Sequence, residues 1–308
     1  MHELKLMDVQ KKYKDKEAVR KFNYTFTNGV YGLLGENGAG KTTLMRLICG
    51  VLQPTGGSIY CDNIEIASMG AEYRRLLGYL PQDFGYYGDF TAERFLRYMA
   101  ALKALPEDYA DSRIDELLDM VELKNVKKKK LKTFSGGMIR RIGIAQALLN
   151  NPEILILDEP MNGLDPIGIY EMREYLVNLC KEGNTTVFIS SHILSEIEQI
   201  ADVIGVMNHG RLLEEESITD LHKRLRRYAE YEVSNVEYVF SLLKERLDVS
   251  EILIDGKNRI RLFGKEMHRI EEINSYLIQN NIPIRQIRIE EENLEDYFSE
   301  LIGGGEIE

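Results

Sequence analysis

Gly35-Glu36-Asn37-Gly38-Ala39-Gly40-Lys41-Thr42 is the stretch that decides the fold, because it matches the phosphate-binding pattern of glycine, four residues and then Gly-Lys-Thr. Residues 30–34 before it form an apolar run of strand length, and residues 43–48 after it repeat apolar side chains at helical spacing. Strand, glycine loop and helix, in this order, are the context that the pattern requires. The stretch therefore predicts a binding site for nucleotide phosphates rather than a glycine-rich turn with a chance Lys-Thr.

The residue types of this loop fit that chemistry. Glycines let main-chain N–H groups turn inward around an anion, and the following helix adds the partial positive charge of its N-terminus. Lys41 is expected to reach the β- and γ-phosphates, and the Thr42 hydroxyl is expected to bind Mg²⁺. The other loop residues expected to contact the nucleotide are Gly35, Asn37, Gly38, Ala39, Gly40 and Thr43.

Length and composition limit the alternatives. At 308 residues the chain is long enough for about two domains, and its net charge of −11 argues against general nucleic-acid binding, which needs a basic surface. The most basic run, residues 127–130, has no interleaved aromatics and is interpreted as a solvated face. No apolar run approaches the roughly 18 residues of a membrane span, and the first residues do not resemble a signal peptide. We therefore expect a cytoplasmic protein that is at most peripheral to a membrane.

The three cysteines, Cys49, Cys61 and Cys180, lie far apart and form no Cys-x-x-Cys pair. They are expected to be reduced thiols. No His or Cys stands at the sequence spacing of a zinc site, so we expect no metal site from them.

Apolar runs of strand length alternate with helical segments over the first two thirds of the chain. Residues 154–157 are consecutive aliphatics, and residues 185–190 form another buried-strand pattern. This alternation predicts α/β architecture with a mainly parallel sheet, in which ligands bind at the carboxyl ends of the strands. Further strands are expected at 2–10, 18–28, 58–61, 76–80, 203–207 and 211–213, and helices at 92–105, 113–121, 138–149 and 168–182, with Tyr13 in the loop after the first strand.

The composition changes near Glu214-Glu215-Glu216, so we expect a first domain over 1–216 and an accessory domain over 217–308. A polar helix near 219–227 leads into the second region. Its pattern is strand 229–234, helix 236–247, strands 251–254 and 259–263, helix 265–280, strand 284–289 and a closing helix 293–302. The order β-α-β-β-α-β predicts a small α+β domain of the ferredoxin-like kind.

Two acids follow the aliphatic strand 154–157 and are expected at the same sheet edge as the glycine loop. Asp158 suits Mg²⁺ binding through water, and Glu159 suits a general base that orients an attacking water. A strand that runs into a polar turn before Pro160 is the alternative. The glycine loop favours the catalytic interpretation.

Ser135-Gly136-Gly137, directly ahead of a helix, is a second anion-binding end. The chain then has two phosphate-holding ends but one phosphate-loop lysine. This suggests that each end serves a different nucleotide, with two chains sharing two sites. By itself, the segment would be read as an ordinary helix cap with glycines.

Six motifs in this order resemble the ATP-binding subunit of an ABC transporter. They are residues 35–43, Gln82, residues 135–137, residues 158–159, Gly163-Leu164-Asp165 and His192. The resemblance covers roughly residues 2–215. It implies a P-loop NTPase core with an N-terminal antiparallel β subdomain and a helical subdomain at about 84–149. It also implies head-to-tail pairing, with ATP and Mg²⁺ held between one phosphate loop and the partner's Ser-Gly-Gly helix.

The same resemblance assigns expected roles. Tyr13 would stack on adenine, and Gln82 would reach toward Mg²⁺ while reporting nucleotide to the membrane partner. Asp165 would line the dimer seam, and His192 would contact the γ-phosphate and the water near Glu159. A plain surface tyrosine and a strand-end histidine are the alternatives for Tyr13 and His192.

Two departures refine the resemblance. The family usually has Leu before the serine and Gln after the glycines, where this chain has Phe134 and Met138. The main-chain anion site needs neither side chain, but a polar contact from the Gln position is put in doubt. Met at this place, and the closing segment 293–298, resemble the branch that works with drug- and peptide-exporting permeases of the ABC-2 type.

The sequence thus predicts the ATPase subunit of a membrane exporter of drug, antibiotic-peptide or similar cargo. It would work as a homodimer or heterodimer of ATPase chains on the inner face of the cell membrane, with separate multi-span permease chains and no nucleic acid. Coupling is expected through Gln82 and the aromatic stretch 84–87. The alternatives are a soluble ABC-type ATPase acting on ribosomes or DNA, and a nucleotide sensor that does not hydrolyse. The single nucleotide domain and the acidic chain disfavour the first, and Glu159 with His192 disfavours the second.

Overall fold

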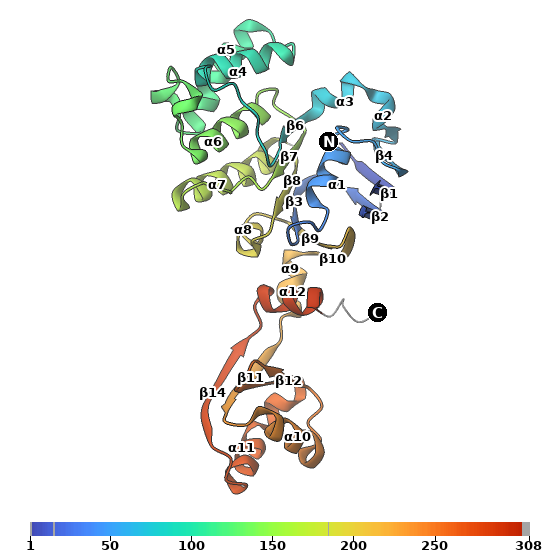
Figure 1. Ribbon diagram of the computed structural model, residues 1–308, viewed down its shortest axis with the longest axis vertical. Coiled ribbons are helices and arrows are strands. Elements are labelled where there is room, and N and C mark those ends of the chain that lie inside the picture. Colours follow the sequence, from blue (N-terminus) through green and yellow to red (C-terminus); the bar gives the residue numbers. More distant parts are fainter. Residues whose placement is uncertain (1, 15, 184, 304–308) are drawn as a thin grey trace. The chain divides into compact units, whose positions relative to one another are not determined.

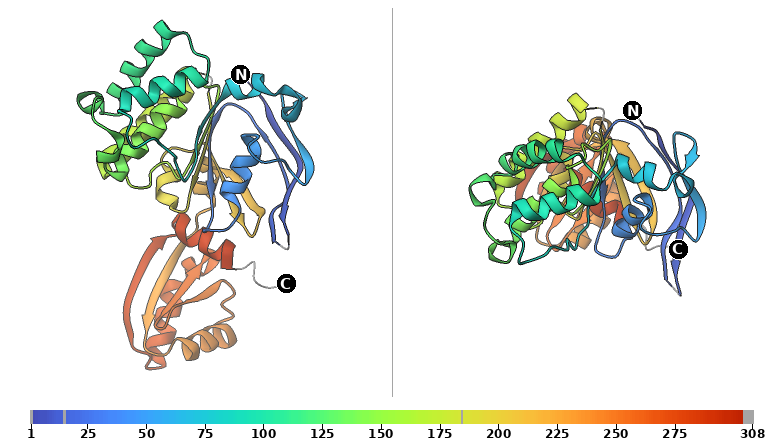
Figure 2. Two further views of the ribbon diagram at one scale, coloured as in Figure 1. Left: turned by 45° about the horizontal axis from the view of Figure 1, so that its top comes forward. Right: turned by 90° about the horizontal axis from the view of Figure 1, so that it is seen from above.

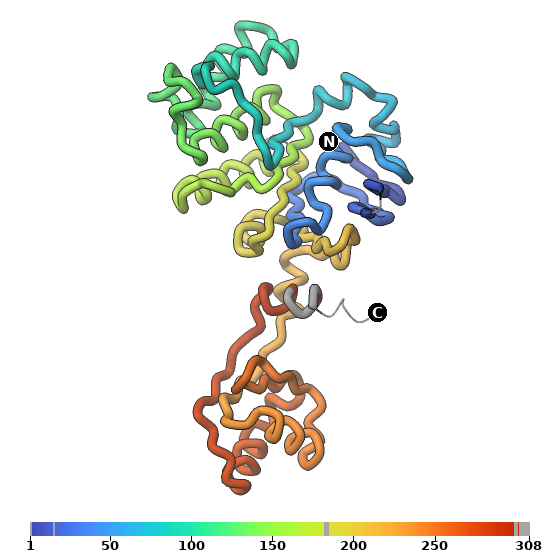
Figure 3. Tube along the Cα trace, in the orientation of Figure 1, coloured from blue at the N-terminus to red at the C-terminus, as the bar shows by residue number. Residues whose placement is uncertain are grey.

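The computed structural model describes residues 2–14, 16–183 and 185–303, which form two compact units (Figure 1). The first unit is Met1–Ile218 and the second is Thr219–Glu308. The division falls two residues beyond the predicted boundary at 216. Figure 3 traces the chain through each unit in turn.

A six-stranded sheet organises the first unit, in the order β10-β9-β3-β8-β7-β6. The pairs β9–β3, β3–β8, β8–β7 and β7–β6 are parallel, and β10 runs antiparallel to β9. All residues of β7 and β8 are buried, as expected for central strands covered on both faces. The bounds are β3 Gly29–Leu34, β6 Leu77–Leu80, β7 Ile154–Asp158, β8 Thr186–Ser191, β9 Val203–Asn208 and β10 Arg211–Ser217.

The register of this sheet brings the motifs together. Leu34, the last residue of β3, pairs with Ser191 of β8, and Asp158 of β7 pairs with Ser190. The phosphate loop, the two acids and His192 therefore leave neighbouring strands at the same edge. This confirms the predicted mainly parallel sheet.

A second, antiparallel sheet has the order β2-β1-β4-β5 and forms the expected N-terminal subdomain. Tyr13 is the last residue of β1 rather than a loop residue, because β1 and β2 stay paired to Tyr13↔Lys16. The strand continues past the predicted end at residue 10, although the residues that follow are polar. The bounds are β1 Leu4–Tyr13, β2 Lys16–Phe26, β4 Gly56–Cys61 and β5 Ile64–Glu65.

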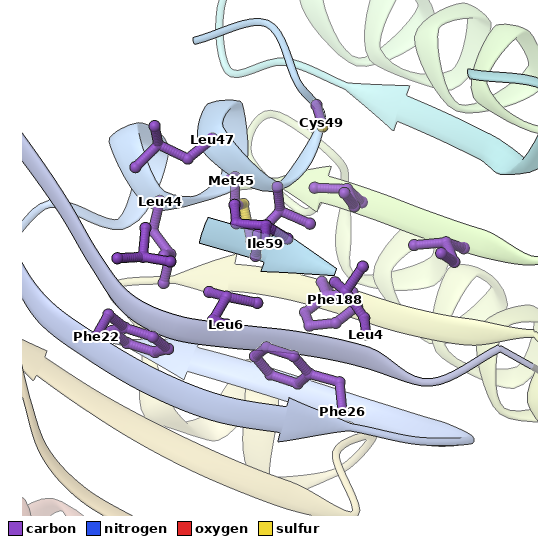
Figure 4. Packing of buried hydrophobic residues seen from close by; sticks show 14 of the residues in the cluster. Leu4, Leu6, Phe22, Phe26, Leu44, Met45, Leu47, Cys49, Ile59 and Phe188 are labelled. Carbon is purple, nitrogen blue, oxygen red and sulfur yellow. The ribbon is translucent and has the colours of Figure 1, made fainter. Parts of the chain in front are cut away.

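One apolar core of the first unit lies between the two sheets and around helix α1, Lys41–Ile48 (Figure 4). Leu4 and Leu6 of β1 contribute from the antiparallel sheet, Leu44 from α1 and Phe188 from β8. The helix that follows the phosphate loop is thus fixed on both sides by apolar packing, which holds its N-terminus in place.

Other helices lie on the face of the six-stranded sheet opposite α1, as both views of Figure 2 show. Helix α5 begins at Glu107, directly after Pro106, rather than at the predicted 113, because acidic residues suit a first helical turn. Short helices α2, α3 and α8 were not predicted. The bounds are α2 Ile66–Met69, α3 Ala71–Leu76, α4 Ala92–Leu102, α5 Glu107–Met120, η1 Lys124–Val126, η2 Leu131–Thr133, α6 Gly136–Ala147, α7 Pro166–Gly183 and α8 Leu194–Glu198.

The second unit contains an antiparallel sheet in the order β12-β13-β11-β14, with its own apolar core. This is the predicted ferredoxin-like succession, closed by α12, in which Leu294 and Phe298 are buried. The bounds are α9 Ile218–Arg224, β11 Arg227–Val233, α10 Val236–Leu247, β12 Ile252–Asp255, β13 Arg259–Phe263, η3 Gly264–Arg269, α11 Ile270–Gln279, β14 Ile284–Glu291 and α12 Leu294–Gly303. Among the described residues, no helix combines the length and the apolarity needed to cross a membrane.

Candidate active site

The phosphate loop needs its glycines. Gly38 and Gly40 have φ angles of +91° and +111°, which side chains rarely adopt. A Cβ at Gly40 would lie 2.2 Å from the carbonyl oxygen of Ala18, and one at Gly35 would lie 2.3 Å from that of Met207. The loop is therefore packed tightly against β2 and β9, with Gly40 as the N-cap of α1.

A cleft opens in front of this loop, which we call the phosphate-loop cleft. It brings together Tyr13 from the end of β1, Gln82 from the segment after β6 and Glu159 from the turn after β7. Gly35 and Ala39 lie outside the lining, and Ala39 is buried. The lining residues are Tyr13, Lys16, Ala18, Glu36, Asn37, Gly38, Gly40, Lys41, Thr42, Thr43, Gln82 and Glu159.

Lys41 is buried at the base of the cleft. Its ammonium donates to the carbonyl oxygens of Gly35 and Glu36, and it lies 3.7 Å from Oε1 of Glu159. Burial lowers the pKa of Lys41, and the carboxylates of Glu159 and Asp158 oppose that shift. The lysine thus faces both the cleft and the two acids.

Glu159 is buried, and His192 orients its carboxylate. Nδ1 of His192 lies 2.9 Å from Oε2 of Glu159, and the side-chain amide of Asn162 donates to the same oxygen at 3.4 Å. Oε1 accepts no hydrogen bond within the described part of the chain. The structure therefore holds one carboxylate oxygen by hydrogen bonds, while the other one faces the ammonium of Lys41.

Asp158 is fully buried and is fixed by Ser190 of β8. The Ser190 hydroxyl donates to Oδ1 of Asp158 at 2.6 Å and also accepts from the main-chain N–H of Glu159 at 3.0 Å. Oδ2 of Asp158 is buried and accepts no hydrogen bond from any described residue. Ser190 was not among the predicted site residues, although a polar residue near the end of a buried strand was a signal for it.

These oxygens fit Mg²⁺, which prefers oxygen ligands and keeps several waters. Oδ2 of Asp158 and Oε1 of Glu159, which accept no hydrogen bond from the described residues, lie at the sheet edge beside the cleft. The Thr42 hydroxyl and Oε1 of Gln82 lie 3.4 Å apart and offer two further oxygens. The donor set is that of a hard divalent cation.

Ser135, Gly136 and Gly137 form a separate end, which we call the Ser135 end. Ser135 caps α6, its hydroxyl accepting from the N–H of Met138 at 3.3 Å. Asp165 lies beside the same helix, 3.4 Å from the guanidinium of Arg141. None of these residues lines the phosphate-loop cleft of its own chain. The structure thus gathers the predicted residues into two groups.

Among the described residues, the fold brings one set of possible metal-ligand atoms together. Possible ligand atoms of His2, Cys61 and Asp62 all lie within 4.8 Å of one another. The sequence analysis missed this cluster because His2 is distant from Cys61 along the chain. Both ring nitrogens of His2 already contact carboxylates, those of Asp62 and Glu153, so ion pairing accounts for the cluster.

A phosphate loop with a buried lysine after β3, next to an Asp-Glu pair at the end of β7 on the other side of β8, defines a P-loop nucleoside triphosphate hydrolase. A family model described as ABC transporter matches residues 19–162. Two bacitracin transport ATP-binding proteins are similar over nearly their whole length. The protein from Enterococcus faecalis is 42% identical, with 97% of this chain and 96% of that protein covered. The protein from Bacillus licheniformis is 40% identical, with 99% and 98% covered.

A solved dimeric ATP-binding cassette in a post-hydrolysis state, bound to ADP and Pi, is similar in fold. Its TM-score is 0.65 at 27% identity, and 70% of this chain and 98% of that chain are covered. The present chain belongs to the ABC transporter ATP-binding family. It is an ATPase of a transport system, and its cofactors are ATP and Mg²⁺.

Proposed function

We propose that this ATPase powers export of an antibiotic-peptide or drug cargo, together with a second ATPase chain and a separate multi-span permease. The cargo class rests on the printed names of the two bacitracin transport relatives. Their similarity extends through the second unit, which supports a shared role for the whole chain. Such a chain would sit as a peripheral subunit on the inner face of the cell membrane.

One observation carries the paired arrangement. Besides the phosphate loop, the chain has a second glycine-flanked helix N-terminus, the Ser135 end, which lies outside the phosphate-loop cleft. In a head-to-tail pair, each ATP would contact Lys41 of one chain and Ser135 of the other. ATP binding would then join the two chains, and hydrolysis would release them.

The residues of the cleft support a hydrolytic step. Glu159 would orient a water and accept its proton as that water attacks the γ-phosphorus and the bond from this phosphorus to the β-phosphate oxygen breaks. His192 holds the carboxylate of Glu159 at 2.9 Å and so fixes the direction of that acceptor. Lys41 offsets charge on the transferring phosphoryl group, since positioning and electrostatics dominate this chemistry.

Thr42, Gln82 and Asp158 are the residues that would hold Mg²⁺, Asp158 through water. When bound, the ion would neutralise negative charge that develops on the phosphate oxygens. Asn37, Gly38, Gly40 and Thr43 line the same cleft and would contact the phosphates. Tyr13, exposed at the rim of the cleft, would stack on adenine.

The segment after Gln82 supports a contact with a membrane partner. Tyr86, Tyr87 and Tyr98 are exposed large aromatics. Tyr87 packs edge-on against Tyr98, and Phe90 joins them with the Arg94 guanidinium 4.2 Å from its ring. Exposed aromatic side chains that gather in one place are a common feature of protein–protein contact surfaces. We assign this surface to the permease. The acidic chain and the transport relatives give no support to a ribosome or DNA role.

The test measures the mass of the Glu159→Gln protein by light scattering, with and without Mg-ATP. We expect a monomer that becomes a dimer with Mg-ATP, because glutamine preserves the cleft but cannot accept the proton. The matched control, Glu159→Gln with Lys41→Ala, should stay monomeric. A monomer that binds ATP without pairing, or a dimer independent of ATP, would contradict nucleotide-driven closure.

A further inference from the structure

We propose that Arg140 is a positioning residue that fixes Glu159 relative to Gln82 and ties both to the Ser135 end. The proposal deepens the function above: the positioning of Glu159 stands on this chain alone, whereas the link between two nucleotides rests on the proposed pairing. Neither the motifs nor the comparisons assign a role to Arg140.

The guanidinium of Arg140 donates hydrogen bonds to main-chain carbonyl oxygens of two separate segments. A guanidinium has five N–H donors in a fixed planar fork. The Nη1 group of Arg140 donates to the carbonyl oxygens of Pro81 and Gln82, at 3.0 and 3.1 Å. The Nη2 group donates to the carbonyl oxygens of Asp158 and Glu159, and Nε to that of Pro160 at 3.4 Å. One side chain thus serves the main chain of two segments that follow different strands.

The environment makes these bonds costly to break. Arg140 is 7% exposed, and burial lowers the pKa of its guanidinium while the nearby charges of Asp158 and Glu159 oppose that shift. A guanidinium does not lose its proton in proteins, so the buried cation requires acceptors. Carbonyl oxygens supply them. The same carbonyls would be left without this donor if Arg140 were replaced.

The turn that Arg140 holds is strained. Glu159 has a φ angle of +54°, in the left-handed region that side chains rarely adopt. Such a backbone conformation persists where several surrounding contacts hold it in place. Arg140 binds the carbonyls of residues 158, 159 and 160, so it fixes the chain before, at and after the strained residue. This fixes the direction in which the Glu159 carboxylate leaves the turn.

Helix α6 extends this constraint to the Ser135 end. Arg140 lies on α6, five positions after the N-cap residue Ser135. A Cβ at Gly137 would lie 2.5 Å from the carbonyl oxygen of Gly163, so the start of α6 also packs directly on the loop after Glu159. A shift of the Ser135 end would therefore move the acceptor turn of Glu159 and the main chain of Gln82 together.

A purely structural arginine is the competing explanation, and the substitutions distinguish the two. Lysine keeps the charge and the long stem but has three donors at one point, so it cannot serve both segments. Glutamine removes the charge. If Arg140 positions Glu159, kcat should fall by about a hundredfold in both variants, while ATP affinity changes little, because small misplacements act on the chemical step.

The experiment compares Arg140→Lys and Arg140→Gln with the control Arg113→Gln. Arg113 lies in the same helical region and donates to the carbonyl oxygen of Leu148, away from the cleft. Titration of labelled ATP, steady-state hydrolysis and the melting temperature are measured for each protein. The proposal expects a kcat loss in the two Arg140 variants alone, with near-normal ATP affinity. Equal losses in all three variants, unchanged kcat, or failure of both Arg140 variants to fold would overturn it.

A second arm separates this proposal from the paired function. Arg140→Gln is combined with Glu159→Gln, and Mg-ATP-driven dimerisation is measured. If Glu159→Gln alone fails to pair, the paired function fails, while the kcat result still decides the positioning role. If Glu159→Gln pairs, the double variant should require at least several-fold more ATP to do so. Pairing at the same ATP concentration would remove the link to the Ser135 end.

Discussion

Glu159 and Lys41 form a buried pair whose members also have other partners. The ammonium of Lys41 binds carbonyl oxygens of its own loop, and His192 holds the carboxylate of Glu159. Phosphate oxygens are stronger acceptors than carbonyls for an ammonium, because both groups are then charged. The pair is therefore arranged so that a nucleotide can replace loop contacts of the lysine without disturbing the carboxylate.

We predict that Glu159→Gln keeps ATP binding but slows hydrolysis at least about a hundredfold. Glutamine can retain the contacts to His192 and Asn162, but it cannot take a proton from water. The check is single-turnover hydrolysis of radiolabelled ATP, with ATP affinity measured on the same preparation. Unchanged turnover would remove Glu159 from the role of base, and lost affinity would indicate that the variant damaged the cleft.

The first two glycines of helix α6 differ in their surroundings, so we expect substitutions there to change the stability of the first unit in opposite directions. A Cβ at Gly136 meets nothing within 4 Å, whereas one at Gly137 would lie 2.5 Å from the carbonyl oxygen of Gly163. Where alanine can adopt the native conformation without strain, replacing glycine by alanine stabilises a protein by about 0.4–1 kcal/mol, because the unfolded chain loses conformational freedom. Overpacking against main chain costs about 1–3 kcal/mol. Gly136→Ala should therefore stabilise the first unit, and Gly137→Ala should destabilise it.

Urea unfolding of the two single variants measures whether each substitution raises or lowers the free energy of unfolding. The substitutions are chemically identical and adjacent, so each serves as the control for the other. If both variants shift the midpoint in the same direction, the close approach between α6 and the loop at Gly163 is not present in solution.

The elements that the sequence predicted well are those with a strong local signal. The aliphatic run before Asp158 and the pattern around the phosphate loop locate β7, β3 and α1 without further information. Tyr13 was misplaced because the pairing of β1 with β2 continues through polar residues, which only the partner strand determines. The local spacing of apolar residues does not show how far a strand stays paired with its partner strand.

Parts of the site were not predictable for a related reason. Arg140 acts on main-chain carbonyls, which no motif encodes, and its partners lie as far as 59 positions away along the chain. Ser190 bonds Asp158 across 32 positions. Residues that bind the nucleotide directly are found by type and spacing. Residues that position them are found only once the strands are in register.

The division of the whole chain into two units predicts how it unfolds. Each unit has its own apolar core, so we expect two calorimetric transitions. Nucleotide binds the first unit, and a ligand present at a hundred times its Kd stabilises the folded state by about 2.7 kcal/mol. For a domain of this size, that corresponds to a rise of about 5–10 °C in the melting temperature. Mg-ATP should therefore shift one transition of the Glu159→Gln protein and leave the other in place.

Two variants assign the transitions. Leu277→Ala removes a fully buried side chain from the core of the second unit and should lower only the transition that Mg-ATP leaves unchanged, by the equivalent of about 2–5 kcal/mol. Lys41→Ala in the Glu159→Gln background should abolish the shift produced by Mg-ATP. A single transition that Mg-ATP and Leu277→Ala both move would instead mean that the two units unfold as one cooperative body.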